Sequence, residues 1–368
     1  MLMEWRERFL MVLEHEEPDR LPLDVWLSPA FAAKIRSQLG REELNKFSPD
    51  LWLGVRSIGP GVSEEFARRG VAYEPFIHYG IGVWVEERVM EDEWGVRRRL
   101  TDAGTESRII HHPLESADED SLDEYPFPDP NAPGRFKVTR EDVEKLKDEG
   151  YWVIGGFGTD TFWCQAWYLR GFRQLMTDLY ANPKFVDKLL SKLLEYYVGV
   201  GRKLVELGVD QVNMADDVAA QTGMIISPRL WRRYLKPCYK RLVDTLRIGV
   251  KYIYYHSDGD LRPIIPDLIE IGVNILNPIQ PDCMDLAELK MEYGEKITLW
   301  GGLSVQETLP HGTPEKVEEE VKRTIEICAP GGGFVLGTSN NITQDTPIEN
   351  FFAIYKAARK YGRYPLRW

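Results

Sequence analysis

The stretch KYIYYHSDGDLRPIIPDLIEIGVNILNPI (251–279) decides the fold, because a β-rich apolar run lies at each of its ends. KYIYYH (251–256) begins the stretch and VNILNPI (273–279) ends it. Both runs are almost continuously apolar, which is typical of parallel strands that are covered on both faces. The stretch therefore indicates a parallel sheet.

The same alternation extends over most of the chain. From about residue 150 onward, apolar runs alternate with charged amphipathic segments such as TPEKVEEEVKRTIEICAP (313–330). The other predicted strands are LPLDVWL (21–27), DLWLGV (50–55), YWVIGGF (151–157), VDQVNMA (209–215), KITLWGG (296–302) and GFVLGT (333–338). Eight strands alternating with helices predict a closed (β/α)8 TIM barrel, with an open doubly wound sheet as the alternative. No GxGxxG or GxxxxGK[ST] loop follows an early strand, which disfavours a nucleotide-binding sheet.

Residues 80–150 interrupt this alternation. The segment VWVEERVMEDEWGVRRRLT (83–101) has period-two character on either side of Glu93, Trp94 and Gly95, so we predict a β-hairpin near residues 80–101. A connector rich in proline and aspartate follows and returns to the barrel near Val138. We therefore expect one domain over residues 1–368.

The charge balance excludes several classes of partner. The chain carries 58 acidic and 46 basic residues, and its net charge of −12 repels phosphate backbones. No stretch approaches the roughly 20 apolar residues of a membrane span, and the charged opening helix lacks the apolar core of a signal peptide. The four cysteines have no CxxC spacing, which is typical of a reducing compartment. We expect a cytoplasmic protein that binds neither nucleic acid nor membrane.

Acidic residues and a histidine follow two of the predicted strands. In a TIM barrel the catalytic residues lie just past the carboxyl ends of the strands. His256 and Asp258 are two residues apart, so in an extended segment they face the same way and suit either zinc or acid–base catalysis. Of Asp216 and Asp217, one alternatively caps a helix. We predict Asp216, Asp217 and His256 as catalytic residues, and His256 and Asp258 as metal ligands.

Further residues near the strand ends complete the predicted site. Cys283 lies in a strand-end loop and is predicted as a third metal ligand, although cysteine is more often buried for packing. Aromatic residues near the strand ends suit a flat apolar substrate, although such residues more often belong to the core. The residues predicted to bind the substrate are Arg56, Phe157, Gln221, Gln280 and Asn340.

Four segments of the chain carry a resemblance to a known family. They are DDVAAQTGMIISPRLWRRYLKP (216–237), HSDGDLRPIIPDLIEIGVNILNPIQ (256–280), WGGLSVQETLPHGTPEKVEEEV (300–321) and PGGGFVLGTSNNITQDTPIENFFAIYKAARKYGRYP (330–365). With these segments the chain resembles the uroporphyrinogen decarboxylase superfamily, which also contains cobalamin-dependent methyltransferases acting on methanol, methylamines and aryl methyl ethers. The resemblance is close over residues 205–365 and weaker before them, and it implies a TIM barrel.

The N-terminal region departs from the true decarboxylases of that superfamily. Their MRQAGRYL-type motif supplies arginines that bind the porphyrinogen carboxylates, whereas the equivalent stretch here is DVWLSPAFAAKI (24–35), with no arginine before Arg36. The motif that carries their catalytic aspartate is replaced by DLWLGVRSIGP (50–60). The resemblance therefore does not imply uroporphyrinogen as the substrate.

The thiolate ligands of the superfamily's thiol-directed methyltransferases are also absent. Those enzymes bind zinc through an H-x-C pair and a later cysteine, and the corresponding residues here are Asp258 and Asn340. What remains resembles the branch that moves a methyl group from a small methoxylated or methylated donor to a corrinoid protein, with zinc as the metal implied at His256. Two alternatives stay open: a decarboxylase or lyase for a small carboxylic acid, with Arg56 as carboxylate partner, and a tetrapyrrole-binding protein without catalytic activity.

Overall fold

The computed structural model describes residues 3–39, 52–56, 82–100, 107–158 and 160–367 of the 368-residue chain. The main element is a parallel eight-stranded sheet with the order β1-β14-β13-β12-β11-β8-β7-β2. Each of the eight predicted runs overlaps one of its strands. These are β1 (Leu23–Asp24), β2 (Trp52–Arg56), β7 (Trp152–Gly156), β8 (Gln211–Ala215), β11 (Tyr252–His256), β12 (Ile275–Ile279), β13 (Thr298–Leu303) and β14 (Phe334–Thr338).

This sheet curls around an apolar interior. Four inter-strand steps separate β7 from β13, which corresponds to about 19 Å in a flat sheet. Nevertheless, the ring of Phe9, from helix α1 (Trp5–Leu13), lies 5.2 Å from Trp152 of β7 and 5.4 Å from Trp300 of β13. A single side chain can reach both strands only because the sheet bends around it. Strands β1 and β2 stand at the two ends of the strand order, and the described residues show no pairing between them.

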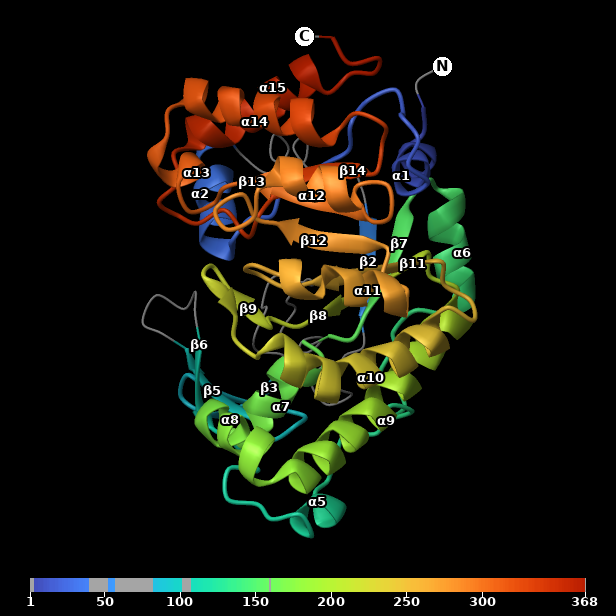
Figure 1. The fold of residues 1–368 in the computed structure, drawn as a ribbon, viewed down its shortest axis with the longest axis vertical. Helices are drawn as coiled ribbons and strands as arrows, with labels where there is room; N and C mark the ends of the chain where they lie inside the picture. Colours follow the sequence, from blue (N-terminus) through green and yellow to red (C-terminus); the bar gives the residue numbers. More distant parts are fainter. Residues whose placement is uncertain (1–2, 40–51, 57–81, 101–106, 159, 368) are drawn as a thin grey trace.

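Helices follow the strands and cover the outer face of the sheet (Figure 1). Their buried apolar side chains, together with those of the strands, form the larger of two core clusters. The helices of this layer are α2 (Pro29–Leu39), α7 (Phe162–Arg170), α8 (Phe172–Ala181), α9 (Pro183–Leu207), α10 (Pro228–Leu246), α11 (Ile265–Ile271), α12 (Leu286–Tyr293), α14 (Pro314–Cys328) and α15 (Ile348–Tyr361). The other helical segments are α5 (Ser121–Glu124), α6 (Arg140–Asp148), α13 (Thr308–His311) and the 3-10 turn Arg262–Ile264.

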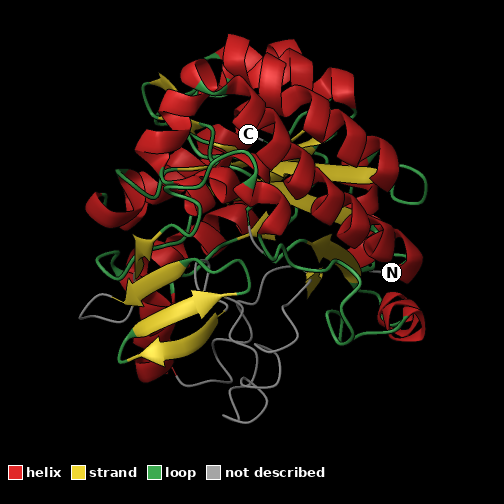
Figure 2. Cartoon of the chain, turned by 90° about the horizontal axis from the view of Figure 1, so that it is seen from below, coloured by secondary structure: helices red, strands yellow, loops and turns green. Residues whose placement is uncertain are grey.

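A separate antiparallel sheet lies between β2 and β7 in the sequence (Figure 2). It has the order β3-β4-β5-β6, formed by Gly82–Glu86, Val89–Asp92, Arg97–Leu100 and Ser107–His111. Strands β4 and β5 pair around a turn in which the Asp92 carboxylate accepts hydrogen bonds from the backbone of Trp94 and Val96, both at 3.0 Å. The segment predicted as a hairpin thus belongs to a larger, four-stranded sheet.

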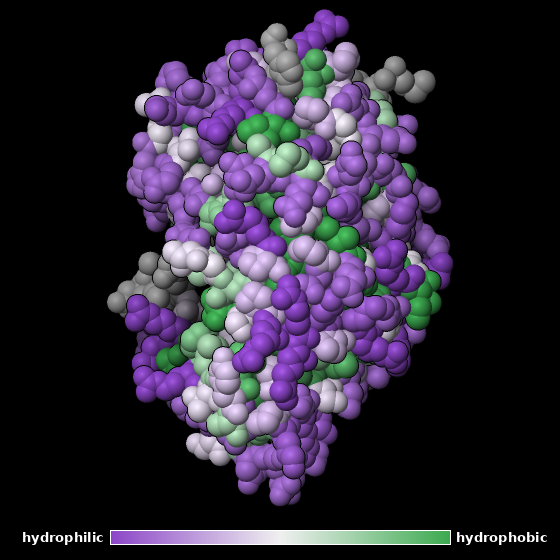
Figure 3. Space-filling model, in the orientation of Figure 1, coloured by the Kyte–Doolittle hydropathy of each residue, from purple (hydrophilic) through white to green (hydrophobic). Residues whose placement is uncertain are grey.

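The surface of the described part is mostly polar. On the face drawn in Figure 3, hydrophilic residues predominate and apolar residues occur in small separate areas. Among the residues that the structure covers, no helix combines the length and the apolar character needed to cross a bilayer.

Candidate active site

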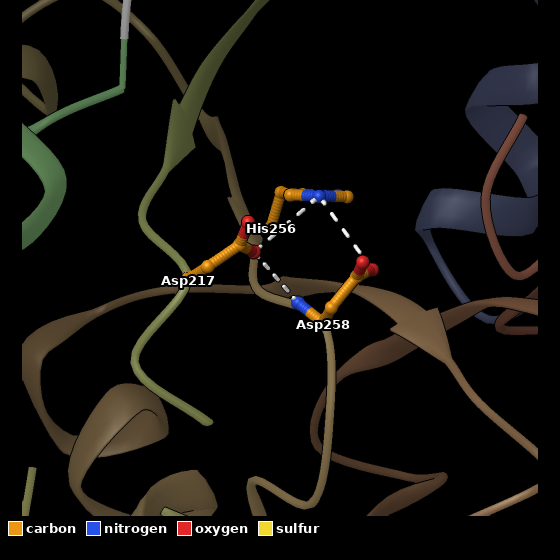
Figure 4. A group of neighbouring side chains, drawn as sticks. All are labelled: Asp217, His256 and Asp258. Atoms are coloured by element: carbon orange, nitrogen blue, oxygen red, sulfur yellow. Dashed lines mark hydrogen bonds and ion pairs between the residues drawn. The ribbon is translucent and has the colours of Figure 1, made fainter. Parts of the chain in front are cut away.

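Three ligand-type side chains meet at the carboxyl ends of β8 and β11 (Figure 4). The two strands are neighbours in parallel register, with His256 opposite Ala215, so the residues that follow them emerge side by side. The carboxylates of Asp217 and Asp258 each lie 3.9 Å from Nε2 of His256. One ligand atom from each residue lies within 4.8 Å of the other two, and we call Asp217, His256 and Asp258 the Asp–His–Asp group.

The ring of His256 is held in one orientation. Its Nδ1 lies 2.7 Å from Oδ1 of Asn277, and because an amide oxygen only accepts, Nδ1 carries the hydrogen. Nε2, the atom that faces both carboxylates, is then free to accept a proton or a metal ion. The indole of Trp26 stacks on the imidazole with 5.7 Å between ring centroids. A histidine that donates its distal N–H to a fixed oxygen is the usual arrangement of a metal-binding histidine.

Asp258 is positioned by both its backbone and its side chain. Its backbone N–H donates to Oδ1 of Asp217 at 2.9 Å, and Nδ2 of Asn340 donates to its Oδ2 at 2.7 Å. Its other carboxylate oxygen, Oδ1, is buried and has no hydrogen-bond partner among the described residues. This is the oxygen that faces Nε2 of His256. A buried acceptor without a partner is costly, so it marks a place where a ligand can be gained.

The acids and the histidine shift one another's pKa. Burial lowers the pKa of His256, but the nearby carboxylates of Asp258 and Asp217 outweigh burial and raise its pKa above the ordinary value. Burial also raises the pKa of Asp258, although His256 acts in the opposite direction. Burial, followed by the charge of Asp217, raises the pKa of the nearby Asp160 to about 6. The site therefore holds more acid than its single histidine can neutralise.

Asp216 lies beside this group in the sequence but has a structural contact pattern. Its carboxylate is fully buried and accepts hydrogen bonds from the backbone of Trp163 and Cys164, both at 2.6 Å, in the first turn of α7. The hydroxyl of Tyr239 also donates to it. Burial raises the pKa of Asp216 to about 7. Of the two adjacent aspartates, Asp216 anchors a helix start and Asp217 belongs to the Asp–His–Asp group.

A cavity of about 500 Å³ adjoins the group and includes Asp217 in its lining. Trp163 and Trp167 of α7 and Phe172 of α8 form an aromatic wall, with 6.2 Å between the rings of Trp163 and Phe172. Arg98, from the antiparallel sheet, lines the cavity too. We call this space the aromatic cavity. It can hold a planar molecule next to the Asp–His–Asp group.

Comparison with known proteins identifies the family of the chain. The sequence profile of the family described as uroporphyrinogen decarboxylase (URO-D) matches residues 89–361, which is more than half of the chain. The chain belongs to this family. The predicted resemblance to the uroporphyrinogen decarboxylase superfamily is thereby confirmed.

The relatives of this chain include a methyltransferase and a decarboxylase. A methylated-thiol–coenzyme M methyltransferase from Methanosarcina mazei is 24% identical over 200 residues, a match that covers 53% of this chain and only half of that relative. A uroporphyrinogen decarboxylase from Mannheimia succiniciproducens is 21% identical, with 72% of this chain and 74% of the relative covered.

A solved structure supports the URO-D fold over almost the whole chain. The structure, described as a methyltransferase from Methanosarcina mazei, has a TM-score of 0.62 and 18% sequence identity, and the match covers 98% of this chain and 99% of that one. At this level of identity the likeness establishes the fold alone.

Asn340 and Asp258, the two residues that replace the cysteine ligands of related methyltransferases in the sequence comparison, are joined by a hydrogen bond. Asn340 stands where the resemblance places a cysteine ligand, and here its amide hydrogen-bonds to Asp258. Cys283 is outside the Asp–His–Asp group. Its thiol lies 3.6 Å from the carbonyl oxygen of Gln280, and burial raises its pKa to about 11. Asp217, predicted as a catalytic residue, is the third member of the group in place of Cys283.

The residues predicted to bind the substrate lie in different surroundings. Gln280 is buried and accepts a hydrogen bond from the backbone of Gly259 at 3.0 Å, which steadies the loop after Asp258. Phe157 is buried in the core, and Gln221 is exposed and bonds to Gln306. Arg56 ends β2, but its side chain lies outside the described residues.

Sequence reasoning missed three residues that shape this site: Asn277, Asp160 and Arg98. Asp160 and Asn277 were within reach of the rule used for the others, because Asp160 follows β7 and Asn277 lies within β12. Trp26 follows β1 and is one of the aromatic residues near the strand ends that the sequence analysis considered for a flat apolar substrate. Arg98 comes from the antiparallel sheet, and no pattern in the sequence connects that sheet to the strand ends.

Proposed function

We propose that the chain is a methyltransferase that moves a methyl group from a small methoxylated or methylated compound to a corrinoid protein. The observation that carries the proposal is the position of Asp217, which belongs both to the Asp–His–Asp group and to the lining of the aromatic cavity. A substrate in the cavity therefore lies next to groups that can stabilise a leaving heteroatom. The methyltransferase relative within the URO-D family supports the same reaction class.

The Asp–His–Asp group fits a divalent metal such as zinc. Imidazole nitrogen and carboxylate oxygen are both zinc ligands, and three protein ligands are typical of catalytic zinc sites. Asp217, His256 and Asp258 would hold the ion, and the unpartnered Oδ1 of Asp258 is explained by it. When bound, the metal supplies Lewis acidity to the heteroatom that loses its methyl group.

The remaining work falls to residues around the aromatic cavity. Methyl transfer from oxygen or nitrogen releases a poor leaving group, which needs a proton or a cation beside it. Burial and the charge of Asp217 raise the pKa of Asp160 to about 6, so this acid takes up a proton more readily than an ordinary carboxylate. Tyr168 lines the cavity and its hydroxyl donates to Asp160 at 2.6 Å, so this pair connects the proton to the substrate. The aromatic wall excludes water from the reacting atoms.

The proposal takes residues 1–368 as one domain in the cytoplasm. It also takes the curled sheet as a closed barrel, in which β1 and β2 complete the ring. The contact of Phe9 with strands four steps apart supports closure, because a sheet that bends this far brings its end strands toward each other.

The test compares the wild type with His256→Ala, using His311→Ala as a control. His311 is an exposed histidine in α13, away from the cavity lining. Metal content is measured by elemental analysis, and methylcobalamin formation is followed by absorbance with reduced cobalamin and a panel of methoxylated and methylated donors. We expect His256→Ala to lose the metal and to slow methyl transfer by more than about 100-fold, because loss of an outer partner alone costs 10- to 100-fold.

His311→Ala is expected to match the wild type in both measurements. If the wild type forms no methylcobalamin with any donor in the panel, the proposed function is wrong. If it transfers methyl groups without bound metal, and His256→Ala does so equally fast, the role of the Asp–His–Asp group is wrong.

A further inference from the structure

Arg98 is a buried cation in the lining of the aromatic cavity. It lies on β5 and is 7% exposed, and its guanidinium carbon lies 4.5 Å from the ring centroid of Tyr168. In the described part of the chain, no carboxylate lies within ion-pair distance of it. The neighbouring Arg97 is different, since it is exposed and pairs with Glu91 at 2.6 Å. The sequence therefore places a solvated arginine and a buried one side by side.

The acids closest to Arg98 are already engaged elsewhere. Asp92 accepts two backbone hydrogen bonds in the β4–β5 turn, and burial raises its pKa to about 6. Asp160 accepts the hydroxyl of Tyr168. Both acids act on Arg98 only at a range beyond an ion pair. A buried arginine is normally paired, because removing its charge from water without a partner is expensive. The cavity lining thus carries a positive charge that no carboxylate of the described residues neutralises through a direct ion pair.

The rest of the cavity restricts what can neutralise this charge. Arg108, from β6, adds a second, more exposed cation. The rings of Trp163, Trp167 and Phe172 favour a flat apolar body over a hydrated ion. A guanidinium matches a carboxylate in geometry and binds it through two parallel hydrogen bonds.

We propose that the aromatic cavity binds planar carboxylates, with the carboxylate on Arg98 and the methyl-bearing part of the molecule toward Asp217. This assignment rests on the proposed function, because it names the class of methyl donor for the same site. The antiparallel sheet supplies the cation and the main sheet supplies the acids, so the substrate is bound between charges of opposite sign. A neutral analogue of the same shape leaves Arg98 without a partner and binds less tightly.

The test uses unreactive probes, benzoate and benzamide, which differ in charge but little in shape. Binding to the full-length protein is followed by tryptophan fluorescence, since Trp163 and Trp167 line the cavity, and by titration calorimetry. We expect the wild type to prefer benzoate by at least about tenfold. Arg98→Gln is expected to abolish this preference, Arg98→Lys to keep part of it, and the control Arg97→Gln to leave it intact. Thermal melting checks that each variant is folded.

Equal affinity of the wild type for both probes, or no binding of benzoate, overturns the proposal. A folded Arg98→Gln variant that still prefers benzoate overturns it as well. The measurement involves no methyl transfer, so it separates the two claims. The protein could show a benzoate preference that depends on Arg98 and yet never form methylcobalamin. That result would support the carboxylate-binding site and contradict the proposed function.

Discussion

Acids at the two ends of the main sheet differ in their partners: Asp210 at one end is paired with arginine and lysine, whereas within the described residues Asp217 and Asp258 at the other end have neither as a partner. At the amino end, Asp210 precedes β8 and is bound by Arg6 of α1 at 2.6 Å and by Lys147 of α6 at 3.0 Å. At the carboxyl end of the same strand, Asp217 and Asp258 surround His256, and the described residues place no lysine or arginine in an ion pair with either acid.

This difference assigns stability to one end of the curled sheet and the candidate site to the other. Helix α1 covers the amino end with apolar contacts, and its two arginines are paired with acids, Arg6 with Asp210 and Arg8 with Asp19, as expected of a face that only holds the fold together. The carboxyl end keeps an unpartnered carboxylate oxygen beside a cavity, and this costs stability. In TIM barrels the carboxyl end is the catalytic face, so the unmatched charges lie where a metal or substrate can use them.

Removing the aromatic contact at the amino end should have the largest effect on stability. Phe9→Ala deletes a ring that contacts Trp152 and Trp300, and it leaves a cavity in the barrel interior. We expect a loss of about 3–5 kcal/mol in the free energy of unfolding, measured by denaturant titration. Leu10→Ala, at an exposed position of the same helix, is expected to change stability by less than about 0.5 kcal/mol. Similar losses in both variants would contradict the assignment of Phe9 to the interior.

The next effect concerns the matched acid at the amino end. Asp210→Asn removes the charge that binds Arg6 and Lys147, and we expect a loss of about 1.5–3 kcal/mol in the free energy of unfolding at pH 7. The control Asp244→Asn, in an exposed pair with Lys240, is expected to cost less than about 0.5 kcal/mol. Equal losses at both positions would show that burial of Asp210 adds nothing to the pair.

The stability contributed by Asp210 should also depend on pH. Burial raises the pKa of Asp210, but hydrogen bonds from Arg6, from the backbone of Val153 and from Lys147 outweigh burial and hold its pKa below the ordinary value. Its stabilisation is therefore fully present above its unfolded pKa of about 3.9 and is lost as the pH falls through the folded pKa. The difference in unfolding free energy between wild type and Asp210→Asn should stay constant from pH 7 to about pH 5 and shrink below about pH 4. If the difference in unfolding free energy between the two proteins grows toward acid pH, the pKa of Asp210 in the folded protein is raised and not lowered.

The smallest effect, with the opposite sign, is expected at the carboxyl end. Asp258→Asn removes a partly buried carboxylate that has no cationic partner other than His256 among the described residues, so the metal-free protein should gain up to about 1 kcal/mol in unfolding free energy. Chelator-treated protein is used for the measurement. Asp260→Asn, in the same loop and paired with Arg262 at 2.8 Å, is the control and should not stabilise. A clear loss of stability in Asp258→Asn would mean that its charge is matched in the apo protein.

Much of the fold could be predicted because its strands are nearly continuous apolar runs. The same pattern located His256 and Asp258, since residues two apart at a strand end face the same way. It could not decide between Asp216 and Asp217. Which of two adjacent acids faces the site depends on the register of β8 and on where α7 begins, and α7 starts more than 50 residues earlier in the chain.

One residue that the sequence analysis did not place in the site, Arg98, comes from a distant part of the chain. Arg98 reaches the cavity by stacking on Tyr168, 70 positions later, and no local periodicity connects them. Cys283 shows the reverse case, because its nearness to a strand end in the sequence suggested a ligand, whereas its thiol approaches the carbonyl oxygen of Gln280. Proximity to a strand end thus identified the correct face of the sheet, but it did not identify every side chain that faces the cavity.

The antiparallel sheet places part of the cavity lining on a segment that is separate from the main sheet. Strands β8 and β11 lead into the Asp–His–Asp group, whereas the antiparallel sheet of β3 to β6 contributes Arg98 and part of the cavity wall without joining the main sheet. On the proposed function and the proposed carboxylate site, changes within this insertion would alter which molecules bind and would leave the strands of the main sheet untouched. Substrate selection and catalysis would then be inherited on separate stretches of one chain, and an engineer could exchange the first while retaining the second.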